Sequence, residues 1–308
     1  LPIDAPATTV DTQCGSSQQA TNLAYALVAS GTVDVAVGCG VELMSRVEFG
    51  ATTPKDPDSG LPINHNYFEH HEFTTQFEGS ERIADQWEIT REDCDSFGKM
   101  SQDRAARAWS EDRFGTQVVP VEVPVLDDAG VPTGETTTIS RDEGLRETSM
   151  EALAGLRPTG REDGVHTAAT SSQISDGAGA LLLMTAEKAE ALGVTPIARF
   201  VDTCLVGSDP ALMLTGPIGA TAKLLADNAM TIDDIDVVEI NEAFAVQVLG
   251  SARELGMDED KLNVSGGAIA LGHPFGMTGA RITATLLNNL AYHDKTFGIE
   301  AMCVGGGQ

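Results

Sequence analysis

Residues 8–38 read TTVDTQCGSSQQATNLAYALVASGTVDVAVG, and this stretch decides the expected fold. Thr8–Val10 is typical of the end of a strand, and a turn of small residues follows at 13–17. Apolar side chains then recur at helical spacing, at Ala20, Leu23, Ala24, Leu27 and Val28. Gly31 can end that helix, and Asp34–Gly38 fits a short buried strand. The order strand, turn, helix, strand predicts an α/β fold with a parallel sheet.

The region from 46 to about 165 differs in composition from the rest of the chain, with several prolines and a polar aromatic stretch. This difference predicts an insertion into the first half. Inside it we expect a polar aromatic loop, two helices, a strand and a turn-rich loop, at 64–77, Glu81–Trp87, Arg91–Trp109, Val118–Val125 and 127–142. The chain then returns through a strand, Ala178–Met184, and a helix, Ala186–Leu192. We therefore expect an N-terminal half at 1–188 that carries the insertion.

A second α/β half is expected at 195–308. Its strands are predicted at Ile197–Val201, Val237–Ile240 and Ile299–Val304, and its helices at Ile218–Asn228, at Glu242–Leu255 and after Thr278. The order of elements repeats: Cys14, helix, strand, Cys39 in the first half matches His273, helix, strand, Cys303 in the second. This repeat predicts duplicated halves with Cys14 and His273 at equivalent turns before two helices.

Composition excludes several classes of protein. The 308 residues are 42% hydrophobic, which is enough for a sizeable core and excludes a disordered chain. The 19 basic residues against 46 acidic ones give a net charge of −27. Nucleic acids and anionic membrane surfaces bind basic proteins, so neither is an expected partner. No apolar run approaches the roughly 18 residues that a membrane span needs.

The five cysteines are odd in number, widely scattered and without a CxxC pair. This pattern argues against a zinc ribbon and against a disulfide framework, and it favours a reducing cytoplasm. The adjacent side chains of His70-His71-Glu72 point in different directions, and the sequence has no HExxH motif. We therefore expect no metal site.

Cys14 is the first candidate for chemistry, because it stands where a helix is expected to begin. The positive end of the helix dipole and unpaired N–H groups favour a thiolate, which is the reactive form of cysteine. The small neighbours Gly15, Ser16 and Ser17 leave room for a substrate. The alternative interpretation is a buried structural cysteine.

Three further residues are candidates in the second half. His273 lies among glycines (Gly266, Gly267, Gly272, Gly276 and Gly279), which indicates close backbone approach to a ligand or another segment. The run lacks a P-loop lysine and GxGxxG, so a nucleotide cradle is not expected. Asn241 follows a buried strand and either caps a helix or holds a water or ligand. Cys303 ends the last strand before Gly305, where free N–H groups can bind an oxyanion.

Four segments together resemble the thiolase family of acyl-CoA acyltransferases. They are QCGSSQQA at 13–20, NEAF at 241–244, GAIALGHP at 267–274 and CVGGGQ at 303–308. The segment SDGA at 175–178 also resembles the family's return from its inserted loop domain. The resemblance covers essentially the whole chain and implies duplicated α/β/α/β/α layered halves with an inserted loop domain. The family's opening strand–helix units before Cys14 and its last strand are expected to be missing.

The resemblance also implies a mechanism. The Cys14 thiolate attacks the ketone carbon of a 3-ketoacyl-CoA, and Cys303 protonates the departing acetyl-CoA (or propionyl-CoA) and then deprotonates CoA. His273 would activate Cys14 and stabilise the enolate oxygen together with a water held by Asn241. The N–H groups of Cys14 and Gly305 would form a second oxyanion site. The matching motifs imply that Ser172, Ala243 and Phe244 contact CoA, which is a substrate; no permanently bound cofactor is expected.

The chain departs from the family in two places. It has Thr167-Ala168-Ala169-Thr170 where many members have Thr-Ala-Gly-Asn, and QFEGSE at 76–81 where members have a Met-Gly or Gln-Gly stretch that shapes the acyl pocket. The aromatic loop at 64–77 suggests a bulky acyl group, such as a sterol side chain.

We expect degradative thiolysis in fatty-acid or sterol side-chain β-oxidation by a homodimer or homotetramer. The alternatives are a biosynthetic acetoacetyl-CoA thiolase, a ketoacyl-synthase-type condensing enzyme and a non-catalytic acyl-CoA-binding protein. Cys303 argues against the condensing enzyme, which normally has no second catalytic cysteine. The intact set of Cys14, His273 and Cys303 argues against a non-catalytic protein.

Overall fold

The computed structural model describes residues 2–51, 53, 54, 56, 58, 60 and 63–308; the remaining positions of the expected insertion lie outside the described residues. Its helices are α1 (Ser16–Ala29), α2 (Tyr67–His70), α3 (Gln76–Gln86), α4 (Arg91–Ser110), α5 (Met150–Ala154), α6 (Ala186–Leu192), α7 (Gly216–Asp227), α8 (Ala245–Leu255), α9 (Ala268–Leu271) and α10 (Thr278–Tyr292). Its strands are β1 (Val35–Leu43), β2 (Val121–Leu126), β3 (Pro132–Ile139), β4 (Asp176–Met184), β5 (Val237–Ile240) and β6 (Gly298–Ala301). Single 3₁₀ turns lie at η1 (Gln13–Gly15), η3 (Ala168–Thr170), η4 (Ile232–Asp234) and η5 (Glu259–Lys261).

The first sheet is formed by β1 and β4, which pair antiparallel from Val35 opposite Met184 to Leu43 opposite Asp176. The expected parallel sheet is therefore wrong in this half, because the strand that returns from the insertion runs against β1. Thr8–Val10 is not a strand, since it pairs with none of the described residues. The strand predicted at Asp34–Gly38 continues to Leu43, and one face of it is exposed rather than buried.

The second sheet pairs β5 and β6 in parallel, with Ile240 opposite Ala301. All four residues of β5 are buried, so the predicted strand Val237–Ile240 is confirmed at both ends. The strand predicted at Ile197–Val201 is wrong: Ile197 is 81% exposed, and the segment has no ladder partner among the described residues. Strand propensity alone does not make a strand where no neighbouring backbone supplies hydrogen bonds.

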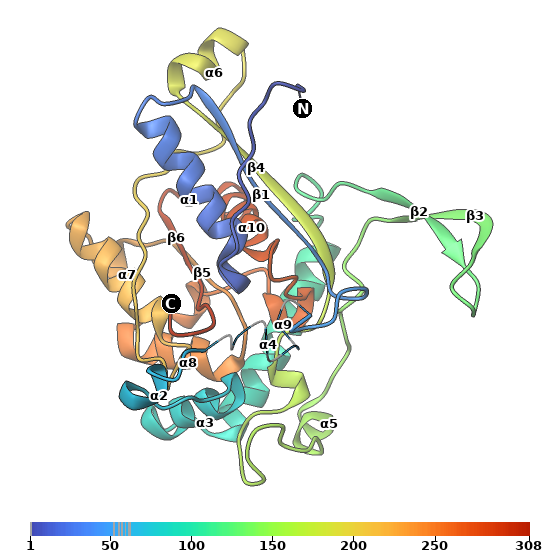
Figure 1. Cartoon of the computed structure of the whole chain (residues 1–308), viewed down its shortest axis with the longest axis vertical. Helices are drawn as coiled ribbons and strands as arrows, with labels where there is room; N and C mark the ends of the chain where they lie inside the picture. The colour runs from blue at the N-terminus through green and yellow to red at the C-terminus, as the bar shows by residue number, and fades with distance from the viewer. Residues whose placement is uncertain (1, 52, 55, 57, 59, 61–62) are drawn as a thin grey trace.

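Helices α1 and α10 pack against each other between the two sheets. Helix α1 also contacts β1, whereas α10 contacts β4 on one side and β5 and β6 on the other. Helices α7 and α8 lie beyond β6, which adds another helical layer (Figure 1). The backbone N–H of Ala280 donates to Ser17 Oγ at 3.0 Å, so the first turns of α1 and α10 lie side by side. The layered α/β arrangement agrees with the predicted fold class.

The region predicted to be an insertion, 46 to about 165, contains α3, α4 and a hairpin. Helix α3 packs against α8, and α4 packs against α8 and α9; the side chains of Thr75 and Thr90 cap the two helices. Residues 127–142 were expected to be a turn-rich loop, but half of them form β3, paired with β2. The carboxylate of Asp127 accepts the N–H groups of Ala129 and Val131 at 2.9 Å and stabilises the connecting turn. Figure 1 shows this hairpin projecting from the body of the molecule.

No helix in the part of the chain that the structure describes is both long and apolar enough to span a bilayer.

Candidate active site

Cys14 lies in the 3₁₀ turn η1, immediately before α1, and its side chain is buried. Burial raises the pKa of the Cys14 thiol to about 11, although the backbone N–H groups of Cys14 and Gly305 contact the sulfur and lower the pKa. The burial of Cys14 favours the thiol over the predicted thiolate, which stays a prediction for the reacting enzyme. Loss of solvation outweighs the N–H groups, so Cys14 needs a base to become nucleophilic.

Cys303 lies two residues after β6 and is 2% exposed. Burial raises the pKa of its thiol, and the nearby Cys14 raises it further by charge repulsion. The turn that follows Cys303 interlocks with the Cys14 turn: a Cβ on Gly15 would lie 2.7 Å from Val304 Cγ2, and a Cβ on Gly305 would overlap Gln13 Oε1. The two sulfurs therefore belong to one packed unit that only glycine backbones allow.

His273 is held by two hydrogen bonds on opposite sides of its ring. Nδ1 lies 2.6 Å from Thr278 Oγ1, and Nε2 lies 3.3 Å from Asn241 Nδ2. The hydroxyl of Thr278 donates its proton to the Pro274 carbonyl at 2.8 Å, so it accepts from His273 Nδ1–H. Nε2 therefore carries the lone pair and accepts from the Asn241 amide. Burial lowers the pKa of His273 to about 3, so the ring is a neutral base.

Asn241 is not a helix cap, because α8 begins at Ala245 and residue 244 takes the N-cap position. The Asn241 N–H donates to the Ala301 carbonyl at 3.0 Å, and the Asn241 carbonyl accepts from Gln247 Nε2 at 2.6 Å. Its Oδ1 atom is buried and has no hydrogen-bond partner among the described residues. The chain thus fixes the backbone of Asn241 and leaves an acceptor for a water or a substrate.

The parallel pairing of β5 and β6 brings Asn241 and Cys303 to the same edge of one sheet, because both residues follow the carboxyl ends of their strands. The adjacent starts of α1 and α10 bring the Cys14 turn and the His273 segment to the same region. The structure therefore gathers the predicted residues from four distant segments. Their individual roles stay predictions.

The residues expected to contact CoA also meet. The N–H of Ser172 donates to the Ala243 carbonyl at 3.0 Å, and Ser171 forms an antiparallel bridge with Phe244. Phe244 is buried, and its ring packs on Phe77, with ring centroids 5.8 Å apart. The paired backbone of residues 171–172 and 243–244 thus forms one short seam, which carries Ser172, Ala243 and Phe244.

Several supporting residues are not among the predicted ones. Thr278 fixes the His273 tautomer, and a hydroxyl residue five positions after a glycine-flanked histidine is too weak a signal to find from one sequence. Glu242 is fully buried and accepts from Ser101 Oγ, Asn263 Nδ2 and the Ile269 N–H at 2.6, 2.9 and 3.0 Å. Its position beside Asn241 in the NEAF segment was a usable signal. It ties the start of α9, which leads to His273, to the end of β5.

A cavity of about 490 Å³ opens beside this site. Gln13 and Gly306, the neighbours of Cys14 and Gly305, form part of its wall, and Asn64, Tyr67 and Phe73 of the aromatic loop form another part. Met213, which has an unusual positive φ of 62°, also lines it. The predicted aromatic loop therefore lies next to the candidate nucleophile.

Comparison with known families agrees with this arrangement. The N-terminal thiolase domain family matches residues 1–187, and the C-terminal thiolase domain family matches residues 194–308. The chain belongs to the thiolase family. Its fold is the α/β thiolase fold: a crystal structure of human mitochondrial 3-ketoacyl-CoA thiolase superposes with a TM-score of 0.87 at 32% identity, covering 99% of this chain and 78% of the other.

Similar thiolases include enzymes with different substrates in their names. A steroid 3-ketoacyl-CoA thiolase of Mycobacterium tuberculosis is 40% identical over 316 residues, 99% of this chain and 74% of that protein. A 3-ketoacyl-CoA thiolase of Bacillus subtilis is 38% identical over 318 residues, 100% and 78%. An acetyl-CoA acetyltransferase of Chromobacterium violaceum is also 38% identical, over 100% of this chain and 79% of that protein.

Proposed function

We propose that this thiolase is an acyltransferase that cleaves 3-ketoacyl-CoA with CoA, as part of β-oxidation. The observation that supports it most is the contact of an unprotonated His273 Nε2 with Asn241, which lies at the same sheet edge as Cys303. A covalent acyl transfer needs a nucleophile, a base and a proton donor, and Cys14, His273 and Cys303 provide these chemical types. The 3-ketoacyl-CoA thiolases among the relatives support the same reaction.

In the first half-reaction His273 Nε2 accepts the Cys14 proton, and Sγ of Cys14 attacks the ketone carbon. The bond between C2 and C3 of the substrate breaks, so the acyl group stays on Cys14 and an enolate of acetyl-CoA leaves. The Cys303 thiol protonates C2 of that enolate. The N–H groups of Cys14 and Gly305 stabilise the tetrahedral oxyanion, and each such donor lowers a barrier by roughly 3 kcal/mol.

In the second half-reaction the Cys303 thiolate takes the proton of CoA. The CoA thiolate attacks the acyl carbon, and Cys14 leaves as a thiolate that recovers its proton from His273. Asn241 donates to His273 Nε2 in the resting site, and its free Oδ1 holds the water that stabilises the enolate oxygen. Every proton that leaves a residue in one step returns in the other.

Substrate recognition divides between two regions. The seam of Ser172, Ala243 and Phe244 contacts CoA, and the 490 Å³ cavity beside Gln13 takes the acyl group. This volume lies within the range of pockets for drug-sized ligands and suits a bulky acyl group, such as a sterol side chain. We propose that the enzyme acts as a homodimer or homotetramer in the cytoplasm and needs no permanently bound cofactor.

A thiolysis assay across acyl lengths tests this function. The protein is mixed with CoA and with acetoacetyl-CoA, long-chain or steroid 3-ketoacyl-CoA, and the formation of acetyl-CoA is followed by chromatography. We expect turnover that disappears in Cys14→Ala. A strict preference for acetoacetyl-CoA would replace the bulky-substrate proposal with the biosynthetic alternative. A wild-type protein that binds acyl-CoA without cleaving it would establish the non-catalytic alternative.

A further inference from the structure

His166 is a buried histidine that the reaction above does not use. It is 1% exposed, and hydroxyl groups meet both of its ring nitrogens. Nδ1 lies 3.2 Å from Thr170 Oγ1, and Nε2 lies 2.9 Å from Ser171 Oγ. Thr170 Oγ1 and Ser171 Oγ also lie 3.1 and 2.8 Å from the Thr167 carbonyl oxygen, so the ring and this carbonyl share the protons of the two hydroxyls. Burial lowers the pKa of His166 to about 4, so the ring stays neutral at physiological pH.

The His166 ring belongs to a cluster of three aromatic rings. Its centroid lies 4.5 Å from that of Phe244 with the planes nearly perpendicular (83°), and 5.8 Å from that of Phe77. Phe77 and Phe244 also contact each other edge to face. Phe244 is 5% exposed and Phe77 is 45% exposed, so the cluster extends from the core to an open surface. Such edge-to-face contacts fix ring orientations.

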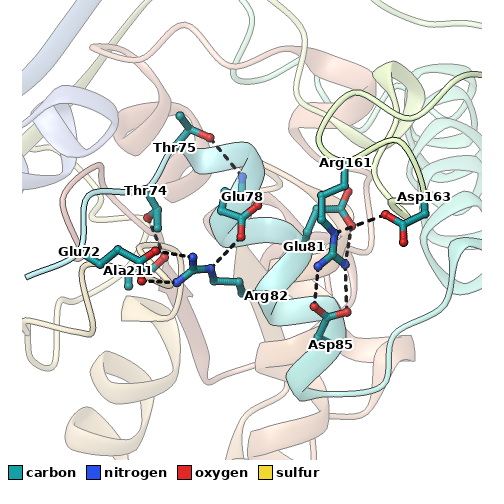
Figure 2. Close-up of polar contacts among 10 residues, drawn as sticks. All are labelled: Glu72, Thr74, Thr75, Glu78, Glu81, Arg82, Asp85, Arg161, Asp163 and Ala211. Atoms are coloured by element: carbon teal, nitrogen blue, oxygen red, sulfur yellow. Dashed lines mark hydrogen bonds and ion pairs between the residues drawn. The ribbon is translucent and has the colours of Figure 1, made fainter.

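Helix α3 contacts this cluster through two of its residues, Glu81 and Phe77. The buried carboxylate of Glu81 accepts the N–H groups of Val165 at 3.0 Å and His166 at 3.2 Å. Figure 2 shows Glu81 beside Arg161, which also forms a bidentate pair with Asp85 at 2.8 and 3.0 Å. One turn earlier on the same helix, Phe77 packs against the His166 ring. Helix α3 therefore fixes both the backbone and the ring of His166.

The backbone at Gly164 packs closely against the side chain of Glu81. A Cβ on Gly164 would overlap Glu81 Oε1, so the loop that carries His166 lies directly against the carboxylate. On another side of the same helix, Arg82 pairs with Glu72 and Glu78, and before the helix Thr74 Oγ1 donates to the Ala211 carbonyl at 2.8 Å (Figure 2). These contacts anchor both the start and the middle of α3.

We propose that His166 is a positioning residue for the pantetheine arm of CoA. Its ring sets the orientation of Phe244 and Phe77, and its bond to Ser171 holds the backbone seam that carries Ser172 and Ala243. The inference rests on the proposed function, because that function assigns the seam to CoA. His166 itself touches neither the thioester nor the reacting sulfurs, so its effect is on binding of the arm rather than on chemistry.

The test uses His166→Phe, which keeps a ring but loses both hydroxyl bonds, and Ser171→Ala, which removes only the Nε2 partner. Exposed His293 at the end of α10 provides the matched control, His293→Phe. We expect the KM for CoA to rise about 10-fold in His166→Phe and about 3-fold in Ser171→Ala, with kcat within 2-fold of wild type. His293→Phe should change neither. The kcat/KM for an acetoacetyl thioester of N-acetylcysteamine, which lacks most of the arm, should stay unchanged.

Two results would overturn the inference: an unchanged KM for CoA in both variants, or an equal loss on the N-acetylcysteamine thioester, which would mean that His166 supports the catalytic residues. The Kd of CoA, measured by calorimetry in each protein, separates this inference from the proposed function. A wild type that binds CoA without turnover refutes thiolysis, yet a weaker Kd in His166→Phe still supports the positioning role. If wild type and both variants bind CoA equally, or none binds it, the positioning role is wrong.

Discussion

The Nδ1 atom of His273 lies 2.6 Å from the hydroxyl oxygen of Thr278, which donates its own proton to the Pro274 carbonyl. This relationship leaves Thr278 only its acceptor function toward the ring. It keeps the proton of His273 on Nδ1 and the lone pair on Nε2, where Asn241 lies. One hydroxyl on the first residue of α10 thus decides which nitrogen can act as a base.

Replacing Thr278 by valine should therefore lower activity without removing any proposed catalytic group. Valine has nearly the same shape but no acceptor, so Nδ1–H would lose its partner and the other tautomer would become populated. We expect kcat for thiolysis to fall about 10- to 100-fold, less than the roughly 10²- to 10⁴-fold contribution of a general base, because part of the protein keeps the correct tautomer. Thr278→Ser, which keeps the hydroxyl, should retain most of the activity. Equal rates for the valine and serine variants would show that the hydroxyl does not set the tautomer.

The alkylation rate of Cys14 should rise with pH throughout the range from 6 to 9. Burial raises the pKa of its thiol to about 11, so the thiolate fraction increases about tenfold for each pH unit below that value. Iodoacetamide labelling with peptide mass spectrometry measures this rate, and exposed Cys39 provides the internal reference. A rate that levels off below pH 8 would mean that Cys14 rests as a thiolate paired with a protonated His273, contrary to the burial of both groups.

Acid should destabilise the protein partly through His166. Its pKa is lowered from about 6.5 in the unfolded chain to about 4 in the fold, so the fold favours the neutral ring. The contribution of this pKa shift to the free energy of unfolding is therefore complete above pH 6.5. It falls by about 1.4 kcal/mol per pH unit as the pH drops toward 4. Urea unfolding of wild type and His166→Phe at pH 7 and pH 5 measures it. We expect the difference in unfolding free energy to shift by about 2 kcal/mol in favour of the variant at pH 5.

His70→Phe provides the control for that titration, since His70 is exposed. A pH-independent difference between wild type and His166→Phe would show that His166 is already solvated in the native protein.

Local elements with strong periodicity could be predicted well from the sequence. The helix Ala186–Leu192 and the strand Val237–Ile240 have the predicted ends, because Gly193 takes a left-handed conformation after the one and every residue of the other is apolar or buried. The hairpin strand Pro132–Ile139 could not be predicted. Its polar, threonine-rich face is fully exposed, so it carries no hydrophobic alternation, and its pairing with β2 alone makes it a strand.

The candidate site divides in a similar way. The types and order of Cys14, Asn241, His273 and Cys303 were enough to predict the family and a thiol-based acyl transfer. The burial that opposes the predicted Cys14 thiolate became visible only in the structure, because the start of a helix can be read from the sequence whereas burial cannot. The partners that orient the site, Thr278 and Glu242, became visible only through their hydrogen bonds.

The sequence by itself determined the family and the chemical groups, since these depend on residue identity and on spacing along the chain. Only the tertiary structure decided that β4 runs antiparallel to β1, that the carboxyl ends of β5 and β6 bring Asn241 and Cys303 to one edge, and that the rings of His166 and Phe244 pack edge to face. Strand pairing, desolvation and ring packing arise between residues far apart in the chain. Their energies depend on which surfaces meet in space, and a one-dimensional pattern does not contain that information.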